Sequence, residues 1–274
     1  TDLTNLVNVL EKEAFAKLSA VQELKRGALA DVFETMRRDV TMFADSEDAE
    51  AAFRDFSAYH DQMQTGANEP LDIEHPDYPK VYDRWYPKLK NYVQEAGYYD
   101  VFLICEAHGH VLFTEAKESD LGANLSSGKL REEGLGRLYQ KVKKTGKLSV
   151  VDFSPYSPSG GDQAAFMGAP VHDDNGKVVA IAALQLPKSR INRIVQARDG
   201  LGETGETFVV GQADGVTAFR SDLLTMGDGE YVVGREIHTE YIDRIMQDGQ
   251  PVREVFEDSN GDLVMVAADP LDLP

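Results

Sequence analysis

The stretch Gly200-Leu-Gly-Glu-Thr-Gly-Glu-Thr207 matches the glycine spacing of two phosphate-binding motifs, GxGxxG and the P-loop. Both motifs need a strand before the glycines and a helix after them, because the helix N-terminus holds the phosphate. Here the order is reversed, since residues 190–197 have helical apolar spacing and Phe208-Val-Val210 is typical of a strand. Glu203 and Glu206 would also repel a polyphosphate. We therefore expect a helix-to-strand junction in which the first glycine caps the helix and the others form a tight turn.

Composition narrows the possible partners. The chain has 274 residues, enough for two modest domains or one large one. It carries 47 acidic against 28 basic residues, a net charge of -19, and has no basic run. Nucleic acid and anionic membrane surfaces are therefore poor candidate partners. The mean hydropathy of -0.37 fits a strongly solvated exterior.

Cysteine usage and the chain ends give further expectations. Cys105 is the single cysteine and lies in an apolar run, so we expect it to pack in a core and form no intrachain disulfide. The sequence has no apolar run of eighteen residues and no signal peptide. Because it starts at Thr1 without Met and stops at Pro274 after a strand-like segment, we expect a soluble piece of a longer protein.

The first third of the chain predicts helices. From Leu3 to Phe43 apolar residues recur at helical spacing without a proline, which predicts one helix of about 60 Å. Such a helix is expected to pair with a copy of itself or to lie along both domains. A second helix is predicted over Glu47–Met63 and a third from Asp77, whose aromatic stripe favours core packing over a lid on an aromatic pocket.

After Gly97 the pattern changes to strands. Five strand-like runs predict an antiparallel sheet with helices on it: 98–105, 111–114, 148–153, 164–171 and 177–186. The last two are joined by Asp173-Asp-Asn-Gly176, a strong hairpin turn. A smaller repeat of this plan follows, with hairpins 207–211/216–220 and 252–257/263–268 and a short helix between them. The second hairpin turns at Asp258-Ser-Asn-Gly261, which lacks the glycine and glutamate spacing of a calcium loop.

Several runs, in this order, carry a family resemblance: residues 97–104, 117–125, 151–159, 168–171, 200–211 and 220–222. The chain resembles the double Cache (tandem PAS-like) sensor domain of bacterial methyl-accepting chemotaxis proteins and sensor histidine kinases. The resemblance implies an α+β fold, a long N-terminal helix followed by two Cache modules with antiparallel sheets. The expected divisions are a spine helix and helical hairpin over 1–76, a membrane-distal ligand-binding module over 77–186, a linker over 187–205, and a membrane-proximal module over 206–274, truncated at its C-terminus.

The resemblance also implies a function. It points to the periplasmic small-molecule-sensing part of a transmembrane chemoreceptor, with membrane helices before Thr1 and after Pro274 and a homodimer formed through the N-terminal helix. The alternative is the sensor domain of a histidine kinase or nucleotide cyclase. Amino-acid-binding members carry an Arg-x-Trp-Tyr run and an Asp two residues after Pro-Tyr. Here Arg131 is the one arginine available and Pro158 occupies the Asp position after Tyr156, which disfavours an amino-acid ligand.

The candidate ligand-binding residues are acids and bases among aromatic groups. Asp100 has two possible roles, accepting backbone N–H bonds or holding a cationic or hydroxyl group of a ligand. Asp152 and Tyr156 end a strand and enter a Pro/Ser/Gly loop, where they either bind ligand or anchor the loop. The full expected set is Asp152, Tyr156, Phe153, Tyr99 and Asp100, with Arg131 and Lys117 as partners for a carboxylate or phosphate and Phe166 and Trp85 as walls.

Enzyme, cofactor and metal sites are not expected. Ser126-Ser-Gly-Lys129 and Lys144-Thr-Gly146 are fragments of the serine β-lactamase set, but they lie too close together and no Ser-Asp-Asn separates them. His108 and His110 flank a turn glycine, and the spacing of the six histidines matches no metal motif. A hydrolytic enzyme and a purely structural dimerisation module remain the lesser alternatives.

Overall fold

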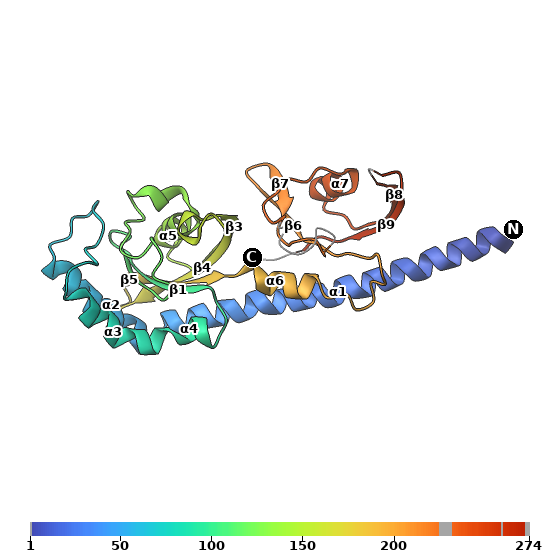
Figure 1. Cartoon of the computed structure of the whole chain (residues 1–274). Coiled ribbons are helices and arrows are strands. Elements are labelled where there is room, and N and C mark those ends of the chain that lie inside the picture. Colours follow the sequence, from blue (N-terminus) through green and yellow to red (C-terminus); the bar gives the residue numbers. More distant parts are fainter. Residues whose placement is uncertain (1, 225–231, 259, 272–274) are drawn as a thin grey trace. The chain divides into compact units, whose positions relative to one another are not determined.

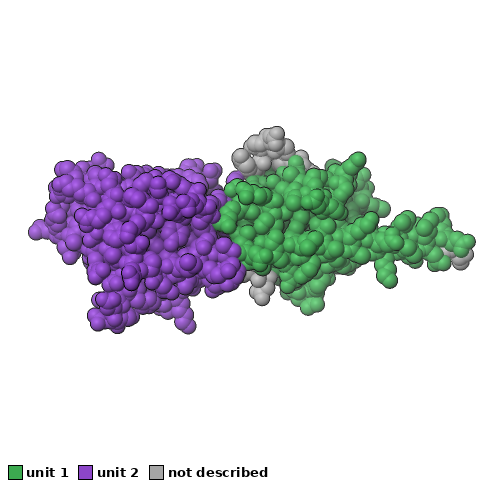
Figure 2. Space-filling model, turned by 90° about the horizontal axis from the view of Figure 1, so that it is seen from below, with its two compact units in different colours: residues 1–33, 189–274 green, residues 34–188 purple. Residues whose placement is uncertain are grey.

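The computed structural model describes residues 2–224, 232–258 and 260–271. The chain forms two compact units, one of residues 1–33 with 189–274 and the other of residues 34–188, coloured separately in Figure 2. Helix α1 (Asp2–Ala44) contributes to both, which confirms the single long helix expected from Leu3 to Phe43. Within the described residues, no helix combines the length and the apolar character that a membrane crossing requires.

Unit 34–188 is built around a five-stranded antiparallel sheet of order β2-β1-β5-β4-β3 (Figure 1). This confirms the predicted sheet, and no strand end differs from its predicted position by more than two residues. The strands are β1 (Asp100–Cys105), β2 (Val111–Thr114), β3 (Ser149–Pro155), β4 (Gln163–His172) and β5 (Val178–Leu186). The central strands are buried on both faces, as their nearly continuous apolar sequences require.

Helices cover both faces of this sheet (Figure 1). Helix α5 (Gly134–Thr145), preceded by the 3₁₀ turn η1 (Lys129–Glu132), packs on β3 and β4. The other face is covered by α2 (Glu47–Gln62), α3 (Tyr78–Leu89) and α4 (Asn91–Gln94). The Tyr82 ring stacks on Phe113 of β2 with centroids 4.8 Å apart, so the aromatic stripe of the third predicted helix is core, as expected.

The strand register places four residues in one row across the face that α5 covers. Asp100 on β1 lies opposite Gln185 on β5, Gln185 lies opposite Phe166 on β4, and Phe166 lies opposite Val151 on β3. Directly opposed residues of neighbouring strands point to the same side of a sheet. Polar side chains from β1 and β5 therefore lie beside aromatic and aliphatic ones.

The other unit contains the end of the chain. Its hairpins are β6 (Val210–Ala213) with β7 (Val216–Phe219) and β8 (Val252–Glu257) with β9 (Leu263–Ala268), separated by α7 (Glu240–Asp248). Both hairpins and the intervening helix are present as expected, but β6 begins three residues later than the predicted strand 207–211, and each hairpin forms a separate two-stranded sheet. Ser259 of the second predicted turn lies outside the described residues.

The glycine-rich junction differs from expectation in one respect. Helix α6 (Lys188–Val195) ends five residues before Gly200, so this glycine does not cap the helix. The C-terminal carbonyls of α6 are instead reached by Lys25 of α1, whose Nζ donates to the Val195 and Ala197 oxygens at 2.6 Å each. An ammonium group satisfies carbonyls there and complements the helix dipole, which makes a glycine cap unnecessary. The helix–loop–strand order is confirmed, since β6 follows the loop.

Candidate ligand site

A buried polar cluster lies on the α5 face of the sheet, at the end where β1 begins. Its most buried members are Asp100, Asp120 and Tyr156, each with no exposed surface, and Gln185 and Ser159 are at most 8% exposed. Asp100 and Gln185 come from adjacent strands, whereas Asp120 lies in the loop after β2. The 3₁₀ turn η2 (Ser157–Ser159) links β3 to β4; Tyr156 directly precedes it and Ser159 is its last residue.

Asp100 fills the first of the two roles that the sequence left open. Its Oδ1 accepts three backbone N–H bonds, from Val101 and Glu115 at 2.8 Å and from Ala116 at 3.1 Å. Its Oδ2 is buried and has no hydrogen-bond partner. One oxygen thus fixes the carboxyl group to the loop after β2, and the other is a buried acceptor without a donor.

Asp120 and Tyr156 form the second part of the cluster. The Tyr156 hydroxyl donates to Asp120 Oδ2 at 2.7 Å, and Asp120 Oδ1 is buried without a partner. The Tyr156 ring packs edge-on against Phe166, with centroids 4.9 Å apart. An acid oxygen without a donor therefore lies next to an aromatic pair.

A chain of hydrogen bonds leads from the cluster to the surface. Gln185 Nε2 donates to Ser159 Oγ at 3.2 Å, and Ser159 Oγ donates to Glu118 Oε2 at 2.8 Å. The hydroxyl of Tyr99, a side chain that is 40% exposed, donates to the other Glu118 oxygen at 2.5 Å. Gln185 Oε1 is a third buried oxygen without a partner.

The electrostatics favour a positively charged occupant. Burial raises the pKa of Asp100 to about 8, partly offset by its backbone N–H bonds and increased by the nearby Asp120. Burial raises the pKa of Asp120 to about 6, partly offset by the Tyr156 hydroxyl. Among the described residues, no basic side chain pairs with either carboxyl group. The cluster therefore holds acceptor oxygens and partial negative charge without a counter-ion.

The structure brings together four of the nine residues expected at the site: Tyr99, Asp100, Tyr156 and Phe166. Asp152 is exposed on β3, between Val151 of the α5 face and the buried Phe153. The pairing of β3 with β4 is irregular between Val151 and Ser154, and after this irregularity the chain brings Tyr156 back into the cluster.

The three remaining residues lie elsewhere. Arg131 is exposed on η1 and pairs with Glu132 at 3.3 Å. The Lys117 ammonium lies 4.1 Å from the centre of the Tyr82 ring, on the α3 side. Trp85 donates its indole N–H to Asp55 of α2 at 2.8 Å, so it is part of the helix packing on the other face of the sheet. A shallow hollow lies near that contact, lined by α2 and α3 residues that include Asp55 and Arg84.

Sequence reasoning missed Asp120, Gln185, Ser159 and Glu118. Gln185 carried a usable signal, because it is a polar residue within the apolar run of β5 and so needs a hydrogen-bond partner. Asp120 and Glu118 lie within one of the runs that carried the family resemblance. Their convergence with β1 and β5 depends on the loop after β2, which local periodicity does not describe.

No protein-family model and no curated protein matches this chain. Solved structures do match. The extracellular domain of the putative histidine kinase soHK1S-Z6 aligns over 97% of this chain and 92% of its own, at 14% identity and a TM-score of 0.54. The chain has the expected α+β fold, a long N-terminal helix followed by antiparallel sheets, and shares it with this domain. Methyl-accepting Chemotaxis protein X aligns over 98% of this chain and 94% of its own, at 11% identity and the same TM-score of 0.54.

A third match is partial. The sensor domain of the V. cholerae histidine kinase DctB aligns over 70% of this chain at 13% identity, with a TM-score of 0.47. The aligned part spans 61% of that domain's length. At such identities the likeness concerns the fold, and ligand and output are inferred separately below.

Proposed function

We propose that this chain is the extracytoplasmic small-molecule-sensing part of a bacterial transmembrane chemoreceptor and that its ligand is a small organic cation. The observation that carries the ligand class is the pair of buried, unpartnered carboxyl oxygens, Asp100 Oδ2 and Asp120 Oδ1. The sensing role is supported by the fold that the chain shares with the two structures above that align over more than 90% of both chains.

An organic ammonium ion suits the cluster for three reasons. Its N–H groups would give each unpartnered oxygen a donor, which removes the cost of leaving a buried acceptor unsatisfied. Its charge would compensate the carboxylates in a site where desolvation makes an unpaired charge costly. The Tyr156 and Phe166 rings would contact its apolar part and interact favourably with its charge.

Binding would act through a shift between conformations. The loop that holds Tyr156 and Ser159 contains Gly160 and Gly161, which have positive φ values of 68° and 84°. An added Cβ at either glycine would meet no atom within 4 Å, so neither glycine packs closely against the rest of the protein. We propose that the loop opens to admit the ligand and that the bound state favours the closed arrangement.

The histidine kinase alternative is supported to the same degree, since the kinase domain and the chemotaxis protein match with equal TM-scores. A nucleotide cyclase output is a further alternative. Fusing the chain to a chemotaxis signalling domain and to a kinase, and measuring which output follows the ligand, would separate the two.

A thermal-shift screen tests the ligand class. We expect primary ammonium compounds to stabilise the chain, and we expect quaternary ammonium compounds, which have no N–H donor, and neutral alcohols of the same size to have no comparable effect. A ligand at about one hundred times its Kd adds roughly 2.7 kcal/mol to the free energy of unfolding. Stabilisation by organic acids or sugars alone would contradict the cationic ligand while leaving a sensing role intact.

Two variants locate the site. Asp120→Asn and Asp100→Asn are expected to weaken binding at least about tenfold, since each removes a carboxyl partner of the cation worth about 1.5–3 kcal/mol. The matched control is Asp152→Asn, which makes the same chemical change at an exposed position of β3. Equal affinity in the control and in Asp120→Asn would place the ligand elsewhere.

A further inference from the structure

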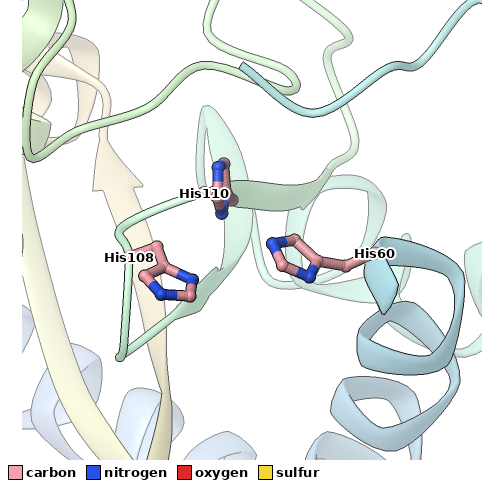
Figure 3. Close-up of side chains that lie close together, drawn as sticks. All are labelled: His60, His108 and His110. Atoms are coloured by element: carbon pink, nitrogen blue, oxygen red, sulfur yellow. The ribbon is translucent and has the colours of Figure 1, made fainter. Parts of the chain in front are cut away.

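Three of the six histidines meet in unit 34–188, away from the residues of the proposed ligand site. His60 lies near the C-terminal end of α2, and His108 and His110 lie on the turn between β1 and β2 (Figure 3). One ring nitrogen from each lies within 4.8 Å of the others. Figure 3 shows the three rings converging from two sides on a common centre.

Each ring directs one unpartnered nitrogen into the protein. His60 Nε2, His108 Nδ1 and His110 Nδ1 are all buried and have no hydrogen-bond partner. Buried nitrogens normally find a partner, because desolvation without a hydrogen bond costs free energy. Three unpartnered nitrogens in one histidine cluster could be satisfied together by a single partner that accepts their lone pairs.

The opposite ring nitrogens fix the tautomers of two of the three histidines, His60 and His110. His110 Nε2 lies 2.7 Å from the Glu69 carbonyl oxygen, and His60 Nδ1 lies 3.2 Å from the Asp61 carboxylate. Both partners are acceptors, so these nitrogens carry the protons and the unpartnered nitrogens keep their lone pairs. A histidine that binds a metal ion is usually held in this way by an acceptor on its other nitrogen.

The supporting shell is ordered around His110. Asn124 Nδ2 donates to the Ala67 carbonyl at 2.8 Å and to the Glu69 carbonyl at 3.2 Å, which holds the acceptor that orients His110. The turn that carries His108 and His110 needs glycine at 109, where φ is 76° and a Cβ would lie 3.0 Å from the Tyr139 ring. This turn therefore holds His108 and His110, which are separated by a single residue, on a restricted backbone.

From this geometry we infer that His60, His108 and His110 bind one divalent transition-metal ion, such as Zn²⁺, and leave its fourth position open. Three neutral imidazoles suit Zn²⁺, Cu²⁺ and Ni²⁺ and do not suit Mg²⁺ or Ca²⁺, which prefer oxygen ligands. Zinc–nitrogen bonds of about 2.0–2.1 Å in tetrahedral geometry place the nitrogens about 3.3 Å apart. The ligand atoms, which lie within 4.8 Å of one another, must therefore come closer on metal binding, and the half-buried His60 and His108 are less constrained than the fully buried His110.

The test is titration of chelator-treated protein with Zn²⁺ by calorimetry, with Co²⁺ as a spectroscopic probe. We expect one Zn²⁺ per chain, and intense visible Co²⁺ absorption bands that report a tetrahedral nitrogen site. His108→Asn should weaken binding about 100-fold and Asp61→Asn about tenfold, the range known for ligands and the groups that orient them. His172→Asn, which changes an exposed histidine at the end of β4, is the matched control and should bind as the wild type does.

Folding is monitored separately by circular dichroism of each metal-free variant, because His108 is only half-buried and its loss should leave the fold intact. Equal Zn²⁺ affinity in the wild type and in His108→Asn would overturn the inference, as would displacement of Zn²⁺ by an equal concentration of Mg²⁺. The absence of stoichiometric Zn²⁺ binding by the folded wild type would overturn it as well.

Discussion

At the scale of single residues, the buried carboxyl groups determine how the ligand-free protein responds to pH. Asp100 is wholly buried and keeps one oxygen without a donor. Its pKa is raised from 3.8 to about 8, chiefly by desolvation. The folded state thus binds a proton that the unfolded state releases over that interval, and protonated Asp100 favours folding.

The first prediction follows from the sign of that shift. The stabilising effect of protonated Asp100 is complete below pH 3.8 and is lost as pH rises through about 8. The slope from one such group is at most about 1.4 kcal/mol per pH unit. Asp100→Asn should remove this part of the slope in denaturant unfolding measured between pH 5 and pH 8, whereas Asp152→Asn should retain it. An unchanged slope in Asp100→Asn would show that the carboxyl group is not protonated by folding.

The second prediction concerns the ligand. An ammonium ion between Asp100 and Asp120 would lower the pKa of both groups, so binding should release protons and tighten as pH rises toward 8. Calorimetry in two buffers of different ionisation enthalpy measures the released protons. Binding without proton release between pH 6 and pH 7 would show that the ligand does not contact these carboxyl groups.

At the scale of elements, the glycine-rich junction is a tight turn between α6 and β6. Gly200 and Gly202 both have left-handed backbones, with φ of 80° and 67°. Their surroundings differ, since a Cβ on Gly200 would lie 2.8 Å from Val21 Cγ2 of α1, while a Cβ on Gly202 would meet nothing within 4 Å. The junction is thus packed against α1 at one glycine and open at the other.

The third prediction uses this matched pair. Gly200→Ala and Gly202→Ala both place a side chain in the left-handed region, at a cost of about 1–2 kcal/mol each. Gly200→Ala should be the more destabilising in chemical unfolding, because its methyl group must also displace Val21. Equal losses of stability would show that α1 does not approach the junction at Gly200.

The fourth prediction concerns the lysine that caps α6. Lys25 Nζ donates at 2.6 Å to each of two carbonyl oxygens, that of Val195 at the end of α6 and that of Ala197 just after it. It also lies 3.1 Å from Thr207 Oγ1. Lys25→Met should cost about 1–3 kcal/mol of stability, because those carbonyls lose a charged donor. Lys17→Met, at an exposed position of the same helix, is the control and should change stability little. A similar loss in both variants would show that the helix, and not the cap, is affected.

At the scale of the whole molecule, the N-terminal end of α1 presents apolar side chains to solvent. Leu3, Leu6 and Leu10 are 74%, 54% and 55% exposed, and they recur at the three- and four-residue spacing of one helical face. Such a stripe is typical of a helix that pairs with a partner helix. Homodimerisation through this helix stays a prediction.

The fifth prediction tests that pairing. The chain should self-associate weakly, and the double variant Leu6→Ser/Leu10→Ser should abolish the association in sedimentation velocity. Ala30→Ser changes an exposed alanine on the opposite face of α1, so it should leave the association unchanged. Monomers at all accessible concentrations would count against pairing through this segment.

The fold was largely predictable because its signals are local. Apolar spacing predicted α1 and α2 to within about one residue at most ends, and the turn at 173–176 predicted the pairing of β4 with β5. The site was predictable only in part. Tyr156 followed from its loop position, but Asp152, four residues earlier, is exposed because it follows Val151 of the α5 face and neighbouring strand residues alternate between the two faces.

The sequence by itself determined the elements, their order and the rejection of nucleotide binding at Gly200–Thr207, because these depend on residues a few positions apart. The tertiary structure alone decided which polar groups meet. Asp100 and Gln185 are 85 positions apart and share a row through strand register, and His60 reaches His108 through the packing of α2 beside β1 and β5. Such encounters depend on sheet order and helix packing over long stretches of chain, and the spacing of residues along the sequence does not encode them locally.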